Sequence, residues 1–141
     1  MANLVPNHLK YLLATGAIDF ANDAFQIILM DSGFTFDVDN DALYADVSAQ
    51  ELANGNGYTT GGETLALDAV TEDDANNRCS VTWDPVSWTA GGGPIGPSPG
   101  AIIYDDTVAG DPIVGFIDFN TEYTQADGGT ATLSGLELRI A

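Results

Sequence analysis

Short apolar runs separated by turn residues are the dominant pattern along this chain. The clearest run extends from Ala24 to Met30 and is closed by Asp31–Gly33. Runs that are rich in β-branched and aromatic residues and bounded by Gly, Pro, Asn or Asp are typical of strands. We expect further strands at Thr64–Thr71, Arg78–Trp83, Val86–Thr89, Ala101–Asp105, Ile113–Phe119, Thr130–Leu133 and Leu136–Ile140. About eight short strands with turns between them indicate a mainly β protein, an antiparallel β-sandwich of jelly-roll-like form.

The stretch from Trp88 to Phe119 predicts the centre of that sandwich. The runs Ala101–Asp105 and Ile113–Phe119 flank a polar segment that contains Gly110–Pro112, and both runs carry apolar residues at consecutive positions. A strand that is apolar on both faces is covered on both sides. We therefore expect a central hairpin here, and we interpret the Gly/Pro-rich segment Gly91–Gly100 before it as a fixed surface crossing.

Two short helical segments are expected. Residues Pro6–Ala14 place three leucines on one side, and Gly16 offers a left-handed stop. The alternative for this segment is an extended arm that docks on a neighbour. Around residues 48–53, Ser48 and Glu51 match a capping box, which predicts a helical turn or two. The sequence thus divides into an N-terminal arm or short helix, residues 1–16, and a single β-sandwich domain, residues 17–141.

Composition fits this fold and limits the partners. The 141 residues are long enough for one domain that buries about 68–70% of its extended surface. The formal charge is −18, from 21 acids and 3 bases (Lys10, Arg78 and Arg139). So acidic a surface repels nucleic-acid phosphates and anionic membranes, and it favours a partner with basic or apolar patches. We expect neither nucleic acid nor membrane as a partner.

The single cysteine, Cys79, excludes an intramolecular disulfide. The first residues lack a basic segment followed by an apolar core, so no signal peptide is expected. The strongest apolar run, Phe25–Met30, is too short to cross a bilayer. We expect a protein made in the cytoplasm of its host.

Nucleophilic catalysis has little support in the sequence. His8 is the only histidine, and no motif surrounds it. Cys79 lies in a strand-like run, which indicates a small core or interface residue rather than a nucleophile. No enzyme activity and no cofactor are therefore expected.

Adjacent carboxylates such as Asp105 and Asp106, Glu72–Asp74, and Asp118 could supply an acid and a base for glycoside cleavage. Adjacent acids also arise by chance in so acidic a chain. We interpret them as solvated loop residues.

The best metal candidate is a weak calcium loop formed by Asp37, Asp39 and Asp41. Alternating acids in a loop can surround one calcium ion with oxygens. An EF-hand would need a glycine where Ala42 stands and a glutamate where Ser48 stands. A solvated turn is therefore the preferred interpretation, and no metal is expected.

Two other motifs suggest binding at first sight. The loop Gly55–Gly62 looks like a phosphate cradle but lacks a Gly-Lys-Ser/Thr sequence, so we interpret its glycines as positions of close backbone approach. Trp83 and Trp88 could form a sugar-binding platform with nearby tyrosines. We instead expect one tryptophan in the core and the other at a subunit contact.

As a set, five segments spread over nearly the whole chain resemble small structural proteins of tailed bacteriophages. They are LVPNHLK (4–10), IDF (18–20), LM-x-SGF (29–34), GNGYTTGG (55–62) and GPSPGAIIYDD (96–106). Within that group the similarity is greatest to head decoration, or cement, proteins, some of which are jelly-roll-like domains that bind capsids as dimers or trimers.

This resemblance implies a protein of the virion, located on the outer capsid surface. Its partners would be the major capsid protein and further copies of itself, as a homo-dimer or homo-trimer, and it would stabilise contacts between capsomers. The negative charge independently favours the outer shell face or the tail exterior over the DNA-filled interior. We expect the partner contacts at two segments, through Leu4, Val5, Pro6, Leu9, Tyr11, Pro94, Ile95 and Pro97.

One alternative is a component of the tail or fibre, in particular a carbohydrate-binding module for host attachment. A small glycan-cleaving enzyme is a more distant alternative. Hundreds of copies on the shell would favour the cement protein, whereas a few copies at one vertex would favour the tail.

Overall fold

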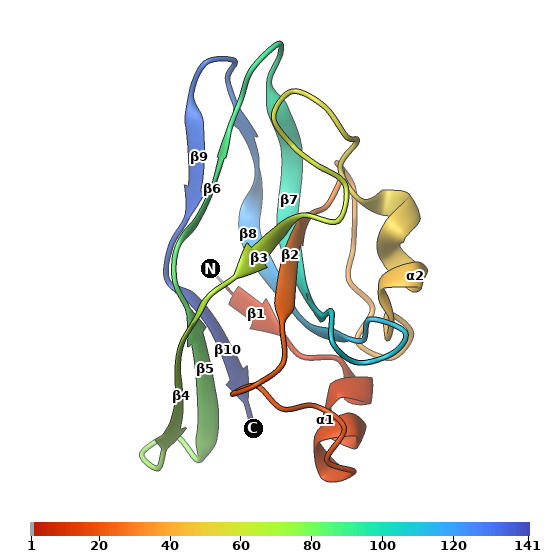
Figure 1. Cartoon of the computed structure of the whole chain (residues 1–141), viewed down its shortest axis with the longest axis vertical. Coiled ribbons are helices and arrows are strands. Elements are labelled where there is room, and N and C mark those ends of the chain that lie inside the picture. Colours follow the sequence, from red (N-terminus) through yellow and green to blue (C-terminus); the bar gives the residue numbers. More distant parts are fainter. Residues whose placement is uncertain (1) are drawn as a thin grey trace.

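The computed structural model describes residues 2–141 as a β-sandwich whose strands run mostly along the long axis of the molecule (Figure 1). All strand pairs are antiparallel. The expectation of a mainly β, antiparallel sandwich with two short helices is confirmed. The strand order leaves the jelly-roll form of that expectation unconfirmed.

The larger layer is a five-stranded sheet with the order β1-β8-β7-β2-β3. Its strands are β1 (Ala2–Leu4), β2 (Phe25–Leu29), β3 (Glu63–Leu65), β7 (Ile95–Asp105) and β8 (Ile113–Gln125). The expected central hairpin is present, because β7 and β8 pair with each other and β7 lies in the middle of the sheet.

The opposite layer consists of two β-ladders arranged end to end. One is the sheet β10-β5-β4, and the other is the pair β6-β9. The strands are β4 (Leu67–Asp73), β5 (Arg78–Trp83), β6 (Val86–Thr89), β9 (Thr130–Leu133) and β10 (Leu136–Ile140). Strand β5 continues into β6 after Asp84–Pro85, and β9 continues into β10 after Ser134–Gly135. The two ladders therefore follow one another along the molecule (Figure 1).

Two separate cores lie on the two faces of the five-stranded sheet. Between the layers, residues such as Ile27, Ile103 and Val114 pack with Trp83 and Leu138. On the outer face a second cluster is covered by the segment that follows β2; it contains Ile28, Met30, Phe34, Phe36, Val47, Ile102, Tyr104, Ile113 and Phe116. Consecutive residues of β7 thus enter different cores, which explains its continuous apolar pattern.

The N-terminal segment belongs to the sandwich. Strand β1 pairs with β8, matching Leu4 with Phe116, and α1 (Asn7–Ala14) follows it. The helix expected from Pro6 to Ala14 is therefore found. Its residue Leu9 is completely buried in the core between the layers.

Several boundaries differ from expectation, including those of the run Thr64–Thr71, which divides into β3 and β4. The second helical segment is α2 (Tyr44–Val47) followed by the 3₁₀ turn η1 (Ser48–Gln50), so it begins earlier than the predicted turn at 48–53. Glu51 turns inward instead of capping a helix. The crossing predicted at Gly91–Gly100 is only half right, since residues 95–100 already belong to β7, and β8 runs on to Gln125. Among residues 2–141 no helix is long and apolar enough to span a membrane.

Candidate functional site

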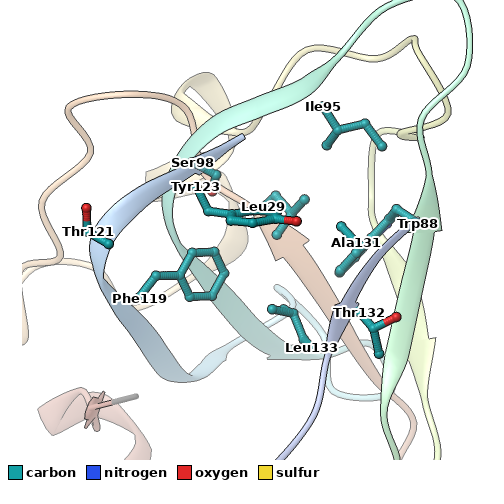
Figure 2. Close-up of a pocket in the computed structure, with 10 residues that line it drawn as sticks. All are labelled: Leu29, Trp88, Ile95, Ser98, Phe119, Thr121, Tyr123, Ala131, Thr132 and Leu133. Carbon is teal, nitrogen blue, oxygen red and sulfur yellow. The ribbon is translucent and has the colours of Figure 1, made fainter. Parts of the chain in front are cut away.

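An apolar cleft opens between the two layers (Figure 2), and the strands β6 and β9 that form one of its walls lie in the half of the molecule opposite α1 (Figure 1). Its volume is about 280 Å³. The β7–β8 layer contributes Phe119, Thr121 and Tyr123 from one wall, and the β6–β9 ladder contributes Trp88, Ala131, Thr132 and Leu133 from the other; Leu29, Ile95 and Ser98 complete the lining. The side chains of Phe119, Tyr123 and Leu133 project toward the same space (Figure 2).

A bulge in β8 shapes one wall of this cleft. Ser98 pairs with Tyr123 and Gly100 pairs with Asp118, so two steps along β7 correspond to five along β8. Within the extra segment, Asn120 has a φ of 64°, and Asp118 Oδ1 accepts a hydrogen bond from its backbone N–H. Bulges redirect side chains at functional sites. Two residues of the cleft lining, Phe119 and Thr121, lie within this segment.

The glycine-rich loop 54–62 covers the edge of the sandwich next to the cleft, because it bonds both to β2 and to the connection between β6 and β7. The backbone N–H of Gly91 donates to the Asn56 carbonyl, and the Asn56 side chain donates to the Pro94 carbonyl. A Cβ on Gly57 would lie 2.0 Å from the Thr89 carbonyl oxygen. The glycines therefore allow close backbone approach, as the sequence predicted.

A buried carboxylate anchors that loop. Glu51 is 9% exposed and accepts hydrogen bonds from the hydroxyls of Tyr44 (2.5 Å) and Tyr58 (2.6 Å) and from the backbone N–H of Gly61 (2.8 Å). Burial raises the pKa of both Tyr44 and Tyr58, and the hydrogen bonds to Glu51 raise it further, so both hydroxyls stay protonated. Three donors from separate segments of the chain converge on Glu51, which indicates a structural clamp.

A second buried carboxylate lies at the far end of β7. Asp105 is 0% exposed; its Oδ1 accepts from the backbone N–H groups of Thr107 and Val108, while its Oδ2 has no partner. Burial and the neighbouring Asp23 carboxyl raise the pKa of Asp105 to about 6. The interpretation of Asp105 as a solvated loop residue is wrong, because it is the last residue of a central strand.

The end of the molecule that carries α1 and the β4–β5 hairpin has a different character. A shallow groove of about 530 Å³ lies there, lined by Leu13, Ile18, Phe20, Val70, Cys79 and Ile140 among others. Among the residues whose side chains are described, four of the five large exposed apolar ones belong to β1, α1 and β4, namely Leu4, Tyr11, Leu67 and Val70. Lys10, Arg78 and Arg139 lie on α1, β5 and β10, all in the same half (Figure 1).

The calcium candidate forms a hydrogen-bonded turn. Asp37 accepts from the backbone N–H groups of Asp39 and Asn40 and from the Asn40 side chain, while Asp41 accepts from the backbone N–H of Asp37. The same arrangement recurs at Asp19–Asp23. Asp39 accepts from the Asn7 side chain. These oxygens accept hydrogen bonds from N–H groups. Within residues 2–141, no group of three or more His, Cys, Asp or Glu side chains is placed so that it could hold a metal ion.

The predicted partner contacts divide between the two ends of the molecule. Leu4 and Tyr11 are exposed near α1, and Val5 is half-buried there. Pro94 and Pro97 are exposed at the opposite end, where the buried Ile95 lines the cleft. A direct contact through Leu9 is wrong in this fold, because its side chain fills the core; Pro6 is also buried.

The tryptophans differ from expectation as well. Trp83 and Trp88 are 3% and 2% exposed and belong to the same core cluster, so neither presents a platform on the surface. The nitrogen of each indole has no hydrogen-bond partner among the described residues.

The sequence interpretation missed the cleft itself. Phe119, Tyr123, Ala131 and Leu133 lie on strands that were largely anticipated, yet the β8 bulge, in which Phe119 lies, has no short motif. The one available signal was the continued alternation from Phe119 through Thr121 to Tyr123.

Comparison with family models, with curated proteins and with solved structures found no match to this chain.

Proposed function

We propose that this chain is a phage capsid decoration, or cement, protein that binds the outer face of the head shell as an oligomer. In this role it acts through contact surfaces and performs no catalysis. The resemblance of its sequence segments to small virion proteins supports the viral context. The distribution of apolar and charged side chains over the sandwich supports binding to a protein surface.

The observation that carries the proposal is the concentration of most exposed apolar groups, and of the three basic side chains, in the α1 half of the molecule. Tyr11 and Val70 are 63% and 48% exposed, and they share their end of the molecule with the apolar groove, with Lys10 and with both arginines. Exposed apolar groups gathered in one region mark a protein interaction site. Elsewhere the charged surface is acidic, which suits a face turned toward water.

The charge also favours the outside of the shell. Each copy carries a net charge of −18, so contact with packaged DNA would bring like charges together. Both arginines are already engaged by carboxylates: Arg78 by Asp73 and Arg139 by Glu137, each at 2.8 Å. Few cations therefore remain to bind phosphate.

The stabilising mechanism is mechanical. Burial of the α1 end on the shell would remove apolar side chains from water, and a stable protein interface buries about 1,200–2,000 Å² in total. Expansion or melting of the shell would then have to break these contacts as well as those between capsomers.

The test is to locate and count the chain on purified virions and to heat particles with and without it. Hundreds of copies on the shell and a lower melting temperature of stripped particles are expected. Tyr11→Gln combined with Val70→Thr should weaken rebinding to stripped shells. Thr60→Ala, at an exposed residue outside the α1 end, serves as the control.

A few copies at one vertex would contradict the proposal and favour a tail or fibre component. Because both tryptophans are buried, a carbohydrate-binding role would also need a sugar site that does not depend on an exposed tryptophan platform. Equal heat resistance of stripped and decorated shells would contradict the stabilising role.

A further inference from the structure

A protein that ties shell subunits together needs two contact surfaces, and the α1 end supplies only one. The apolar cleft lies in the opposite half of the molecule. Two contacts at separate places on one body allow a single copy to span two subunits, and they raise the overall affinity through effective concentration. The cleft is therefore the place to look for the second contact.

The cleft is covered on one side and open on the other. Loop 54–62 covers the side of β6 and β7 through its hydrogen bonds to Gly91 and Pro94. In the α1 half, β1 and β10 approach each other on the other side, where the backbone N–H of Arg139 donates to the Asn3 side chain. Beyond β1, no other strand of residues 2–141 lies between β8 and β9, so the cleft is open on this side.

Two unpaired strand edges border the opening. Within residues 2–141, strand β1 pairs with β8 as far as Asp118, so residues 119–125 of β8 have a described strand neighbour on the β7 side alone. Strand β9 has β6 as its only partner within the described chain. An unpaired edge offers backbone N–H and C=O groups to an incoming extended segment. Such a segment would continue the line of β1 along the same sheet.

The lining favours apolar anchor side chains. Phe119, Leu133, Ala131 and Ile95 supply most of the wall, and the Tyr123 hydroxyl is already bonded to Gln125. The volume of about 280 Å³ is just below the range of about 300–1,000 Å³ that small-molecule pockets occupy. One or two apolar side chains of a peptide fit this space.

The charge around the cleft favours a basic peptide segment over a second copy of this chain as the bound partner. Lys10, Arg78 and Arg139 all lie in the other half of the molecule, whereas Asp118, Glu122 and Asp127 lie along β8 and the turn after it. A second copy would bring another charge of −18 to this acidic half. A segment that carries lysine or arginine beside its apolar residues is complementary to the site.

We propose that the open cleft between β8 and β9 binds an extended, basic and apolar segment of the shell subunit, which adds a strand along the free edge of β8. This inference rests on the proposed function, because it takes the partner from it. It goes further by naming the site, the conformation of the bound segment and its chemistry.

The experiment measures binding of the full-length chain to stripped shells. Ala131→Phe fills the cleft from β9, and Tyr123→Ser removes part of the opposite wall. Both should weaken binding at least about tenfold, whereas Thr60→Ala, at an exposed residue outside both the lining and the β8 edge, should bind like the wild type. In hydrogen exchange, shells should protect backbone amides of residues 119–125.

A peptide array that covers the shell subunit adds the identity of the segment, and the bound peptides should contain lysine or arginine next to apolar residues. Near-ultraviolet circular dichroism checks that each variant is folded. If Ala131→Phe does not fold, Tyr123→Ser decides alone.

The outcomes separate the two proposals. Wild-type binding that both folded variants retain would overturn the cleft as a binding site and leave the decoration role standing. Absence of wild-type binding to shells would overturn both. Self-association in solution that Ala131→Phe abolishes would assign the cleft to a second copy, and binding of only acidic peptides would also contradict the proposal.

Discussion

The Tyr58 hydroxyl donates a hydrogen bond to Glu51 at 2.6 Å and accepts one from the backbone N–H of Leu29 at 3.1 Å. It thereby joins the loop 54–62 to the edge of β2, at a point that β3 does not reach. The Leu52 backbone N–H donates to the Leu29 carbonyl beside it. One side chain thus completes the edge of the central sheet and holds the loop that covers the edge next to the cleft.

Removal of that hydroxyl should loosen the loop. In Tyr58→Phe the buried N–H of Leu29 loses its acceptor, and Glu51 Oε1 loses one of its two donors while keeping the backbone N–H of Gly61. The free energy of unfolding should therefore fall by about 2 kcal/mol. Urea denaturation measures this change. Tyr123→Phe, which loses only an exposed hydrogen bond to Gln125, should change stability little; equal losses in the two variants would contradict the clamp.

The paired glycines of the same loop should differ in their tolerance of a methyl group. Both have positive φ, 93° at Gly61 and 77° at Gly62. A Cβ on Gly62 would lie 1.9 Å from the Ile27 carbonyl oxygen, whereas a Cβ on Gly61 has only the Tyr104 hydroxyl, at 4.0 Å. Gly61→Ala should lower the unfolding free energy by about 1–2 kcal/mol and Gly62→Ala by clearly more. Equal effects in thermal denaturation would show that backbone strain alone governs both positions.

The Asp105 carboxyl should make stability depend on pH. Its folded pKa of about 6 lies above the ordinary value of 3.8, because burial and Asp23 disfavour the charged form. The folded state therefore binds the proton more tightly than the unfolded state. The resulting stabilisation is fully present below pH 3.8 and is lost as the pH rises through 6, a change of about 1–3 kcal/mol.

Asp105→Asn should remove this loss, since the amide carries no charge at any pH in the range. Its carbonyl oxygen can still accept from the N–H groups of Thr107 and Val108, and its NH₂ group can donate to Asp23. Urea denaturation between pH 4 and pH 8 should show a stability advantage of the variant that grows as the pH rises. Asp106→Asn, at the exposed neighbour, should follow the wild-type profile; identical profiles for all three proteins would rule out the Asp105 effect.

The Asp37–Asp41 segment should behave as a hydrogen-bonded turn and not as a calcium site. Hydrogen bonds from Asn40 and Asp39 hold the pKa of Asp37 below its ordinary value. Asp37→Ala should lower the Tm slightly, and added calcium should leave the Tm of both proteins unchanged. A rise in the wild-type Tm with calcium that Asp37→Ala abolishes would establish a calcium site instead.

The strands could be predicted because their signals are local. Arg78–Trp83, Val86–Thr89, Thr130–Leu133 and Leu136–Ile140 are found with the expected bounds, since turn residues flank each run. The sequence also predicted that the β7–β8 hairpin is covered on both faces, because its apolar residues occupy consecutive positions.

The remaining features depend on contacts between residues that are distant in the sequence. Strand β1 has too few residues for a pattern and is defined by its pairing with β8. Glu51 matched a helix cap locally, but the hydroxyls of Tyr44 and Tyr58 draw it inward. The cleft requires the bulge in β8 and the stacking of β6–β9 over it, and neither leaves a motif.

The β7–β8 ladder runs along the long axis of the molecule, with the α1 end and the cleft toward its opposite ends (Figure 1). Eleven residues of β7 span about 35 Å. Antiparallel hydrogen bonds lie perpendicular to the strands, so tension along the axis shears many of them at once instead of opening them one by one. A force between attachments at the two ends would therefore act along the direction in which the sandwich most strongly resists extension.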